Sequence, residues 1–138
     1  MAKDIFHDNA RIALEKDGWM ITAEQLRIDL NESYVEIDLL AESLLAAERA
    51  GERIAVEVKS FLGKSLMSEW HTALGQFLDY RDALEEAEPG QILYLALPID
   101  AYNDRVFQGH FIQRRIAREQ VKLIVFDPES NIIVLWKS

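Results

Sequence analysis

Helical spacing of apolar residues marks the start of the chain and a long central segment. In the first segment, apolar side chains recur three and four positions apart: Ile5, Phe6, Ala10, Ala13 and Leu14. This spacing predicts a helix over 4–17 that ends at Asp17-Gly18. A longer helix is predicted over 65–86, with Pro89-Gly90 beyond its end. Its buried stripe is expected to contain Leu66, Trp70, Ala73, Leu74, Phe77 and Leu84.

Alternation of apolar and polar residues predicts strands between these two helices. One alternating segment is 35–39, and a second is 54–58, where every second residue is Ile or Val. Residues 40–50 have helix-forming composition, which predicts a short helix that ends at Gly51. Residues 19–27 look extended, but their pattern is ambiguous.

The second half of the chain has clearer boundaries. Residues 92–97 form a continuous apolar run, which is typical of an interior strand. Residues 99–119 have helical character with a break near Gly109. Two apolar segments, 123–126 and 132–136, flank a polar turn and predict a C-terminal hairpin.

This order of elements predicts an α/β fold in which helices flank a central mixed sheet. The chain has 138 residues, of which 49% are hydrophobic and 28% charged, so we expect a single domain over 1–138. It contains no cysteine, which excludes a disulfide scaffold, a thiol nucleophile and a Cys-ligated metal. No apolar stretch approaches the ~20 residues of a membrane span, and the N-terminus lacks a secretion signal. We therefore expect a cytoplasmic protein.

Charge is distributed unevenly along the chain. Fifteen lysines and arginines face 24 acidic residues, giving a net charge of −9. This charge argues against a tight DNA binder acting alone, because neutralising phosphates supplies most of the affinity for DNA. Residues 105–122 are nevertheless basic, and Arg114, Arg115 and Arg118 recur there at helical spacing. These arginines are candidate nucleic-acid contacts. The alternative is a solvated helix face, or ion pairs with the acidic helix end near Glu85.

Candidate chemistry concentrates at the end of the strand 54–58. Side chains alternate across a strand, so Glu57 and Lys59 share one face, opposite the Ile and Val residues. Asp38 ends the preceding predicted strand and can approach Glu57 if the two strands pair. Two close carboxylates favour a divalent cation such as Mg²⁺ between them, and Lys59 could then activate water or stabilise a phosphate. Alternatively, Glu57 and Lys59 form an ion pair on a solvated strand and Asp38 is a turn residue.

The predicted long helix adds polar groups beside its buried stripe. Gln76 and Tyr80 are four residues apart and therefore share a face. An amide can bind a metal-bound water or a carboxylate, and a phenol can hold a phosphate. The alternative is a boundary glutamine beside a packed tyrosine. His71 and His110 are isolated, and we interpret both as ordinary polar positions rather than metal ligands.

The set formed by Asp38, Glu57-Val58-Lys59 and Gln76 to Tyr80 resembles the PD-(D/E)xK nuclease superfamily, in its variant with a Q-x-x-x-Y helix. A broader resemblance, to the XisH family, covers nearly all 138 residues through segments such as DIFHDNARIALEKDGW, HTALGQFLDYRDALEEAEP and KLIVFDPESNIIVLW. XisH proteins are named as fdxN-element excision controlling factors, associated with programmed DNA excision in cyanobacteria. The resemblance implies a restriction-endonuclease-like core and a role in DNA recombination.

By position, the resemblance implies a role for each residue of this set. Asp38 and Glu57 would be ligands of Mg²⁺ or Mn²⁺, and Lys59 would be the catalytic lysine. Gln76 and Tyr80 would support the site.

The chain also departs from the family pattern. Ile37 replaces the proline of the superfamily name, and Ala23-Glu24 stands where the family has His-Asp. The first helix of related nucleases often adds one more acid. The candidates here are Asp4, Asp8 and Glu15, with His7 as a neutral alternative.

Two functions remain open on this basis. The first is a metal-dependent deoxyribonuclease acting in programmed excision, which the retained Asp38, Glu57 and Lys59 favour. The second is a non-catalytic accessory protein that binds a recombinase or a companion excision factor, and the acidic charge suits a basic partner. A homo-oligomer would compensate for the small DNA-contacting surface of one 138-residue domain.

Overall fold

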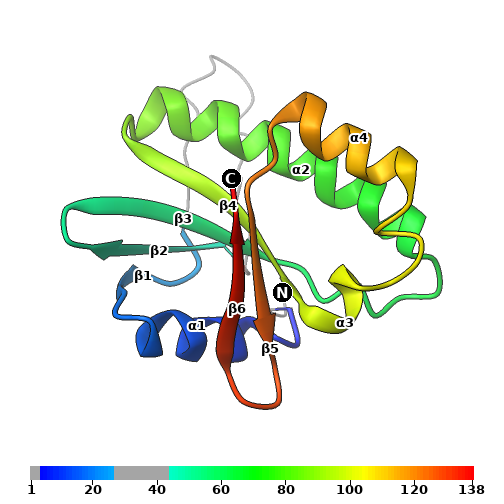
Figure 1. Ribbon diagram of the computed structural model, residues 1–138. Helices are drawn as coiled ribbons and strands as arrows, with labels where there is room; N and C mark the ends of the chain where they lie inside the picture. Colours follow the sequence, from blue (N-terminus) through cyan, green and yellow to red (C-terminus); the bar gives the residue numbers. More distant parts are fainter. Residues whose placement is uncertain (1–3, 27–43) are drawn as a thin grey trace.

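The computed structural model describes residues 4–26 and 44–138, which build a sheet with helices on both faces (Figure 1). Within these residues the strands form one six-stranded sheet in chain order: β1 (Met20–Ala23), β2 (Leu44–Arg49), β3 (Glu52–Val58), β4 (Gln91–Pro98), β5 (Leu123–Asp127) and β6 (Ile132–Lys137). The helices are α1 (His7–Lys16), α2 (Leu66–Ala87), α3 (Ile99–Tyr102) and α4 (His110–Glu119). None of the helices in these ranges combines the length and hydrophobicity that crossing a membrane requires.

The connections explain which helices share a face. β3, β4 and β5 are parallel neighbours, whereas the β1–β2, β2–β3 and β5–β6 pairs are antiparallel. Each parallel pair needs a crossover, and crossovers are right-handed. Since both crossovers advance in the same direction across the sheet, α2 and α4 lie on one face, while α1 lies on the other (Figure 1).

The sheet separates two hydrophobic clusters, and β3 contributes to both of them. Ala55 belongs to the cluster under α2 and α4, together with Trp70 and Phe77. Val56 and Val58 belong to the cluster under α1. The face of β3 that carries the alternate residues is therefore also buried, so Glu57 is placed in an apolar environment rather than in solvent.

The predicted helix over 40–50 is wrong for the part that the structure describes. Leu44–Arg49 is strand β2, which pairs with β1 on one side and β3 on the other. Its helix-forming composition yields to tertiary structure, because a central strand buried on both faces gains more from packing than from propensity. Ala50 and Gly51 both have positive φ, 51° and 86°, as a tight hairpin turn between β2 and β3 requires. The predicted strand 35–39 lies outside the described residues.

The first helix begins later than its apolar spacing predicts. It starts at His7, and Ile5 is 70% exposed because the preceding residues form a turn instead. The turn is held by Asp4, whose Oδ1 accepts a hydrogen bond from the Phe6 N–H at 2.9 Å. At the other side of the helix, Asn9 donates to the carbonyl of Pro128 and to Oδ1 of Asn131. The segment is thus tied to the β5–β6 turn.

Other predicted elements are confirmed. The long helix covers 66–87 with its expected stripe buried or partly buried, and residues 91–98 form an interior strand between β3 and β5. The helical region 99–119 is divided before Gly109, and the C-terminal hairpin is present as β5 and β6.

Candidate functional site

Glu57 is a buried carboxylate near the carboxyl end of β3. Its side chain is 1% exposed, and neither carboxylate oxygen has a hydrogen-bond partner among the described residues. Burial raises the pKa of Glu57 to about 8, although the nearby Lys59 ammonium partly opposes this effect. Because the side chain is buried, Glu57 is not part of the solvated ion pair that was the alternative interpretation of this position.

Lys59 lies two residues further on, where β3 has just ended. Its Nζ is 4.0 Å from Oε1 of Glu57, and its side chain is 30% exposed. The backbone N–H of Lys59 donates to the carbonyl of Ala96 on β4, which extends the parallel pairing past the strand end. The expectation that Glu57 and Lys59 share one face of the strand is therefore confirmed. The Lys59 ammonium lies closer to solvent than the Glu57 carboxyl group.

The helix α2 brings a phenol and an amide to the face of the sheet that carries Glu57. Tyr80 is buried, and its pKa is raised to about 12 by burial, by Glu57 and by Asp79. The phenol therefore stays protonated and can act as a hydrogen-bond donor across the ordinary pH range. Gln76, one turn earlier, has a buried Oε1 without a partner in the described residues.

Asp38 lies outside the described residues, so the structure does not test its approach to Glu57. Leu26 and Leu44, the described residues that flank residues 27–43, meet beside the site. The Leu26 N–H donates to the carbonyl of Leu44 at 2.7 Å, and Leu44 is the cross-strand neighbour of Glu57.

The four first-helix candidates occupy three different positions, because Asp8 lies beside His7. Asp4 lies next to the site, because its Oδ2 accepts a hydrogen bond from the Ser60 N–H at 2.9 Å, directly after Lys59. Glu15 lies near the other end of α1 and pairs with Arg11 at 2.8 Å. His7 is buried, and its Nε2 lies 3.2 Å from Oε1 of Glu24.

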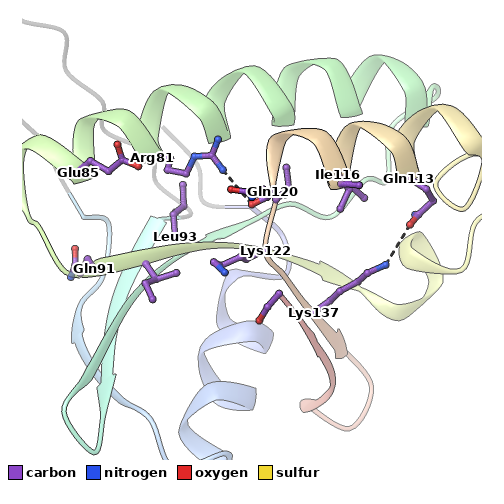
Figure 2. A pocket seen from close by; sticks show the side chains of 13 residues that line it. Arg81, Glu85, Gln91, Leu93, Gln113, Ile116, Gln120, Lys122 and Lys137 are labelled. Atoms are coloured by element: carbon purple, nitrogen blue, oxygen red, sulfur yellow. Dashed lines mark hydrogen bonds between the residues drawn. The ribbon is translucent and has the colours of Figure 1, made fainter.

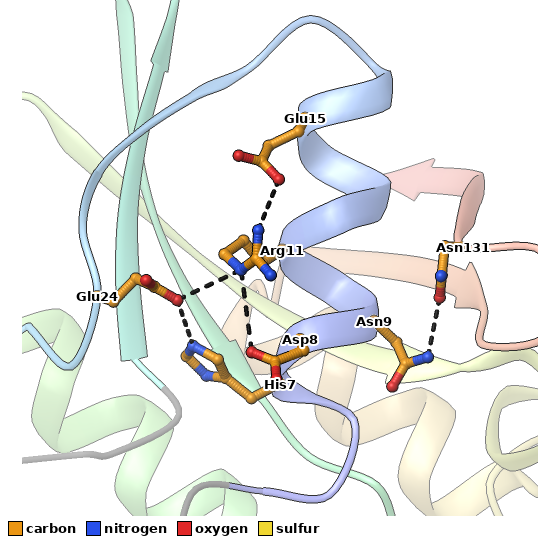
Figure 3. A network of polar contacts seen from close by, with 7 residues as sticks. All are labelled: His7, Asp8, Asn9, Arg11, Glu15, Glu24 and Asn131. Carbon is orange, nitrogen blue, oxygen red and sulfur yellow. Dashed lines mark hydrogen bonds and ion pairs between the residues drawn. The ribbon is translucent and has the colours of Figure 1, made fainter.

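The His7–Glu24 contact belongs to a cluster of polar side chains that was not predicted from the sequence (Figure 3). Donor atoms of His7, Asp8 and Glu24 lie within 4.8 Å of one another, as they would around a metal ion. However, the Arg11 guanidinium lies 3.9 Å from Asp8 and 3.5 Å from Glu24 and supplies positive charge there. The signal available in the sequence was the unusual Glu24, which departs from the family pattern.

The hydrogen bonds of Asp4 give a prediction for stability. Asp4→Ala should lower the free energy of unfolding by about 1–2 kcal/mol, because two backbone N–H groups lose their acceptor. Chemical denaturation measures the change, with the exposed Asp82→Ala on α2 as the control. Equal stability of the two variants would contradict the view that Asp4 fixes the backbone beside Lys59.

The three arginines come together with one another but not with Glu57. Arg114, Arg115 and Arg118 line a groove between α4 and α2, whose α2 wall includes Leu74 and Leu78. The site residues Gln76 and Tyr80 each lie two positions beyond one of these leucines, which is ~200° around a helix. The arginines therefore lie beside the opposite flank of α2 from the candidate site.

Another pocket, of about 720 Å³, is lined by residues of α2, β4, α4 and β6 (Figure 2). Its lining includes Gln91, which pairs with Arg53 at the start of β3, so the pocket opens at the opposite end of the parallel strands from Glu57. Arg81 lines it and donates to the carbonyls of Glu119 and Gln120 at 2.6 and 3.3 Å. This arginine satisfies the end of α4, and the pocket is separate from the candidate site.

The chemistry around Glu57 fits a hard divalent cation. Mg²⁺ and Mn²⁺ take oxygen ligands, and the Glu57 carboxylate is buried with both oxygens unpartnered in the described part of the chain. A cation would supply the missing partner and would lower the pKa of the carboxyl group. The fit rests on Glu57, because Asp38 is outside the described residues.

A family model described as XisH protein matches residues 1–134. The chain is 48% identical to an XisH family protein of known crystal structure from Nostoc punctiforme PCC 73102, with a TM-score of 0.88 over 98% of this chain and 100% of that one. It is 46% identical to an fdxN element excision controlling factor from Anabaena variabilis, with a TM-score of 0.87 over 96% and 98% of the two chains. A search of curated proteins found no match.

Proposed function

Because the chain belongs to the XisH family, we propose that it acts in the control of DNA excision, as a metal-dependent phosphodiesterase of the PD-(D/E)xK type. The name of the relative from Anabaena variabilis supports the first part, since that protein is an fdxN element excision controlling factor. The similarity extends over nearly the whole of both chains, so the same role is the natural proposal for this one.

The observation that carries the catalytic part is the environment of Glu57. A carboxyl group that is 1% exposed and has no hydrogen-bond partner among the described residues lowers stability when it ionises, unless something else binds it. Its partly exposed neighbour Lys59 is within 4.0 Å. A buried acid beside a solvent-accessible amine is expected of a reaction centre rather than of a core.

Each residue of the set has a role in this proposal. Glu57 and Asp38 would hold Mg²⁺ or Mn²⁺, which when bound polarises a phosphate and lowers the pKa of water. Lys59 would position the attacking water or stabilise negative charge on the phosphate. Tyr80, protonated up to about pH 12, would donate a hydrogen bond, and the Gln76 amide would orient a neighbouring group.

A non-catalytic accessory role is the second candidate. The net charge of −9 favours it, because such a chain attracts a basic protein more readily than DNA phosphates. In that role the protein would bind a recombinase or a companion factor and would not need Lys59. The two candidates therefore differ in how they respond to loss of this side chain.

Metal titration tests the proposed site without knowledge of the DNA substrate. Mn²⁺ and Mg²⁺ titrated by calorimetry should bind the wild type, and Glu57→Gln should lose about tenfold or more in affinity because a charged ligand is removed. Glu52→Gln, at the exposed start of the same strand, is the matched control and should bind as the wild type does.

Two results would contradict the metal site. One is equal affinity of Glu57→Gln and the wild type, which would place any bound cation elsewhere. The other is no binding to the wild type at millimolar metal, which would favour the accessory role.

A further inference from the structure

A groove of about 510 Å³ runs between α2 and α4, on the flank of α2 that faces away from Gln76 and Tyr80. Its walls contain the apolar side chains of Leu74, Leu78 and Phe111, and its arginines are Arg114, Arg115 and Arg118. Phe111 is 44% exposed, so a large apolar surface is left uncovered there. An exposed aromatic ring within a concave surface is typical of a binding site rather than of a core.

Gly75 lies in the middle of α2 and lines this groove. A glycine inside a helix lowers its stability relative to alanine, because the flexible backbone loses more entropy on folding. Such a residue is usually explained by a close neighbour that leaves no room for a Cβ. At Gly75, a Cβ would meet no atom within 4 Å. No contact within the described residues requires this glycine, so its open backbone is available to something that enters the groove.

The arginines that line the groove favour the binding of an acidic partner. Within the part of the chain that the structure describes, Arg114 and Arg118 form no ion pair, and Arg115 pairs with Glu119 at 3.2 Å. The surrounding stretch 105–122 is basic in a chain of net charge −9. An anionic surface therefore gains complementary charge at this place.

The spacing of the lining residues points to the shape of the occupant. Leu74 and Leu78 are one turn apart on α2, while Phe111, Arg114 and Arg118 recur every three or four residues along α4. A groove between two helices with an apolar floor, a basic rim on α4 and a glycine in the α2 wall fits a third helix, whose backbone can approach closely. DNA phosphates would use the arginines but not the apolar floor or the open backbone at Gly75.

We propose that the α2–α4 groove binds an acidic amphipathic helix of a partner protein. Apolar side chains of that helix would pack on Leu74, Leu78 and Phe111, close to Gly75. Its acidic side chains would pair with Arg114 and Arg118. This proposal goes beyond the role of Glu57 and does not depend on it.

A peptide probe tests the groove directly. The probe is a fluorescein-labelled peptide of about 18 residues, with leucine at i, i+3 or i+4 and i+7 and glutamate between. A scrambled peptide of the same composition is the control, since it has equal charge but no apolar face. By fluorescence anisotropy, the ordered peptide should bind the full chain about tenfold more tightly. Equal binding of both peptides would overturn the proposal.

Gly75→Ala separates binding from folding. The added methyl group should raise the melting temperature by about 3 °C, because alanine is the better helix former and meets no neighbour. The same methyl group should weaken binding of the ordered peptide about tenfold by crowding the groove. A stabilised variant with unchanged peptide affinity would contradict the proposal.

Charge reversal distinguishes a protein helix from DNA. The double variant Arg114→Glu with Arg118→Glu should weaken peptide binding about tenfold or more, whereas Arg105→Glu, in the exposed turn before α4, should not. If the double variant loses affinity for a labelled DNA duplex while the peptide does not bind the wild type, the groove is a DNA surface and the proposal fails. Metal binding at Glu57 should be the same in all of these variants, so either outcome leaves the phosphodiesterase proposal unaffected.

Discussion

Glu57→Gln should make the protein more stable at alkaline pH and leave its stability almost unchanged below the ordinary pKa of 4.5. The folded state keeps the proton of Glu57 up to a pKa of about 8, whereas the unfolded chain releases it near the ordinary value of 4.5. Between these values the folded state binds more protons, so the contribution of Glu57 to stability falls as pH rises. The complete shift corresponds to about 5 kcal/mol, and glutamine avoids it because its amide stays neutral.

Chemical denaturation of the two proteins between pH 5 and pH 9 measures this effect. The difference in free energy of unfolding should grow across that range, while the Glu52→Gln control should follow the wild type, since Glu52 is exposed. A difference that does not change with pH would show that the Glu57 carboxyl group is not held protonated by burial. Mn²⁺ should stabilise the wild type at pH 9 more than it stabilises Glu57→Gln, because the charged carboxylate binds the cation more tightly than the neutral amide does.

Lys59→Ala should lower DNA cleavage or excision by about a hundredfold or more. The Lys59 Nζ is 4.0 Å from Glu57 and partly exposed, so it can reach a phosphate bound at this site. Removing one charge-stabilising donor from a reaction centre typically costs that much in rate. Excision of a DNA element in cells gives one measurement, and Mn²⁺-dependent nicking of plasmid DNA gives the other.

The control for Lys59→Ala is Lys64→Ala, which removes an exposed lysine five residues further along the chain. It should retain excision, whereas Lys59→Ala should lose it without a loss of folded protein. Excision that persists in Lys59→Ala would contradict the phosphodiesterase proposal and support the accessory role. The metal titration separates these cases further, because an accessory protein gives no reason for Glu57 to bind a cation.

The centre of the candidate site was predictable because strand periodicity places side chains reliably. The alternation around Glu57 puts it opposite Val56 and Val58, and the structure confirms this arrangement. What the pattern did not indicate is that the Glu57 face is buried as well. That burial comes from α2, a helix that follows β3 in the sequence and returns over the same face of the sheet.

Segments whose secondary structure depends on contacts with distant parts of the chain were predicted less well. Residues 44–49 carry helix formers but become β2, because β1 and β3 lie on both sides of them. Ile5 was expected in a helical stripe, yet Asp4 holds that part of the chain in a turn. In the same way, helical spacing grouped the three arginines correctly, but only the structure shows which flank of α2 they lie beside.

The attachment of α1 to the end of the chain has a consequence for the order of folding. Asn9 contacts Pro128 and Asn131, which are more than a hundred residues away in the sequence. The helix α1 therefore meets these partners only after residue 131 has left the ribosome. Asp4, at the start of this segment, holds the backbone beside Lys59, so we expect docking of α1 on the hairpin to help order that edge of the candidate site. A nascent chain should therefore lack the complete candidate site until the β5–β6 hairpin has formed.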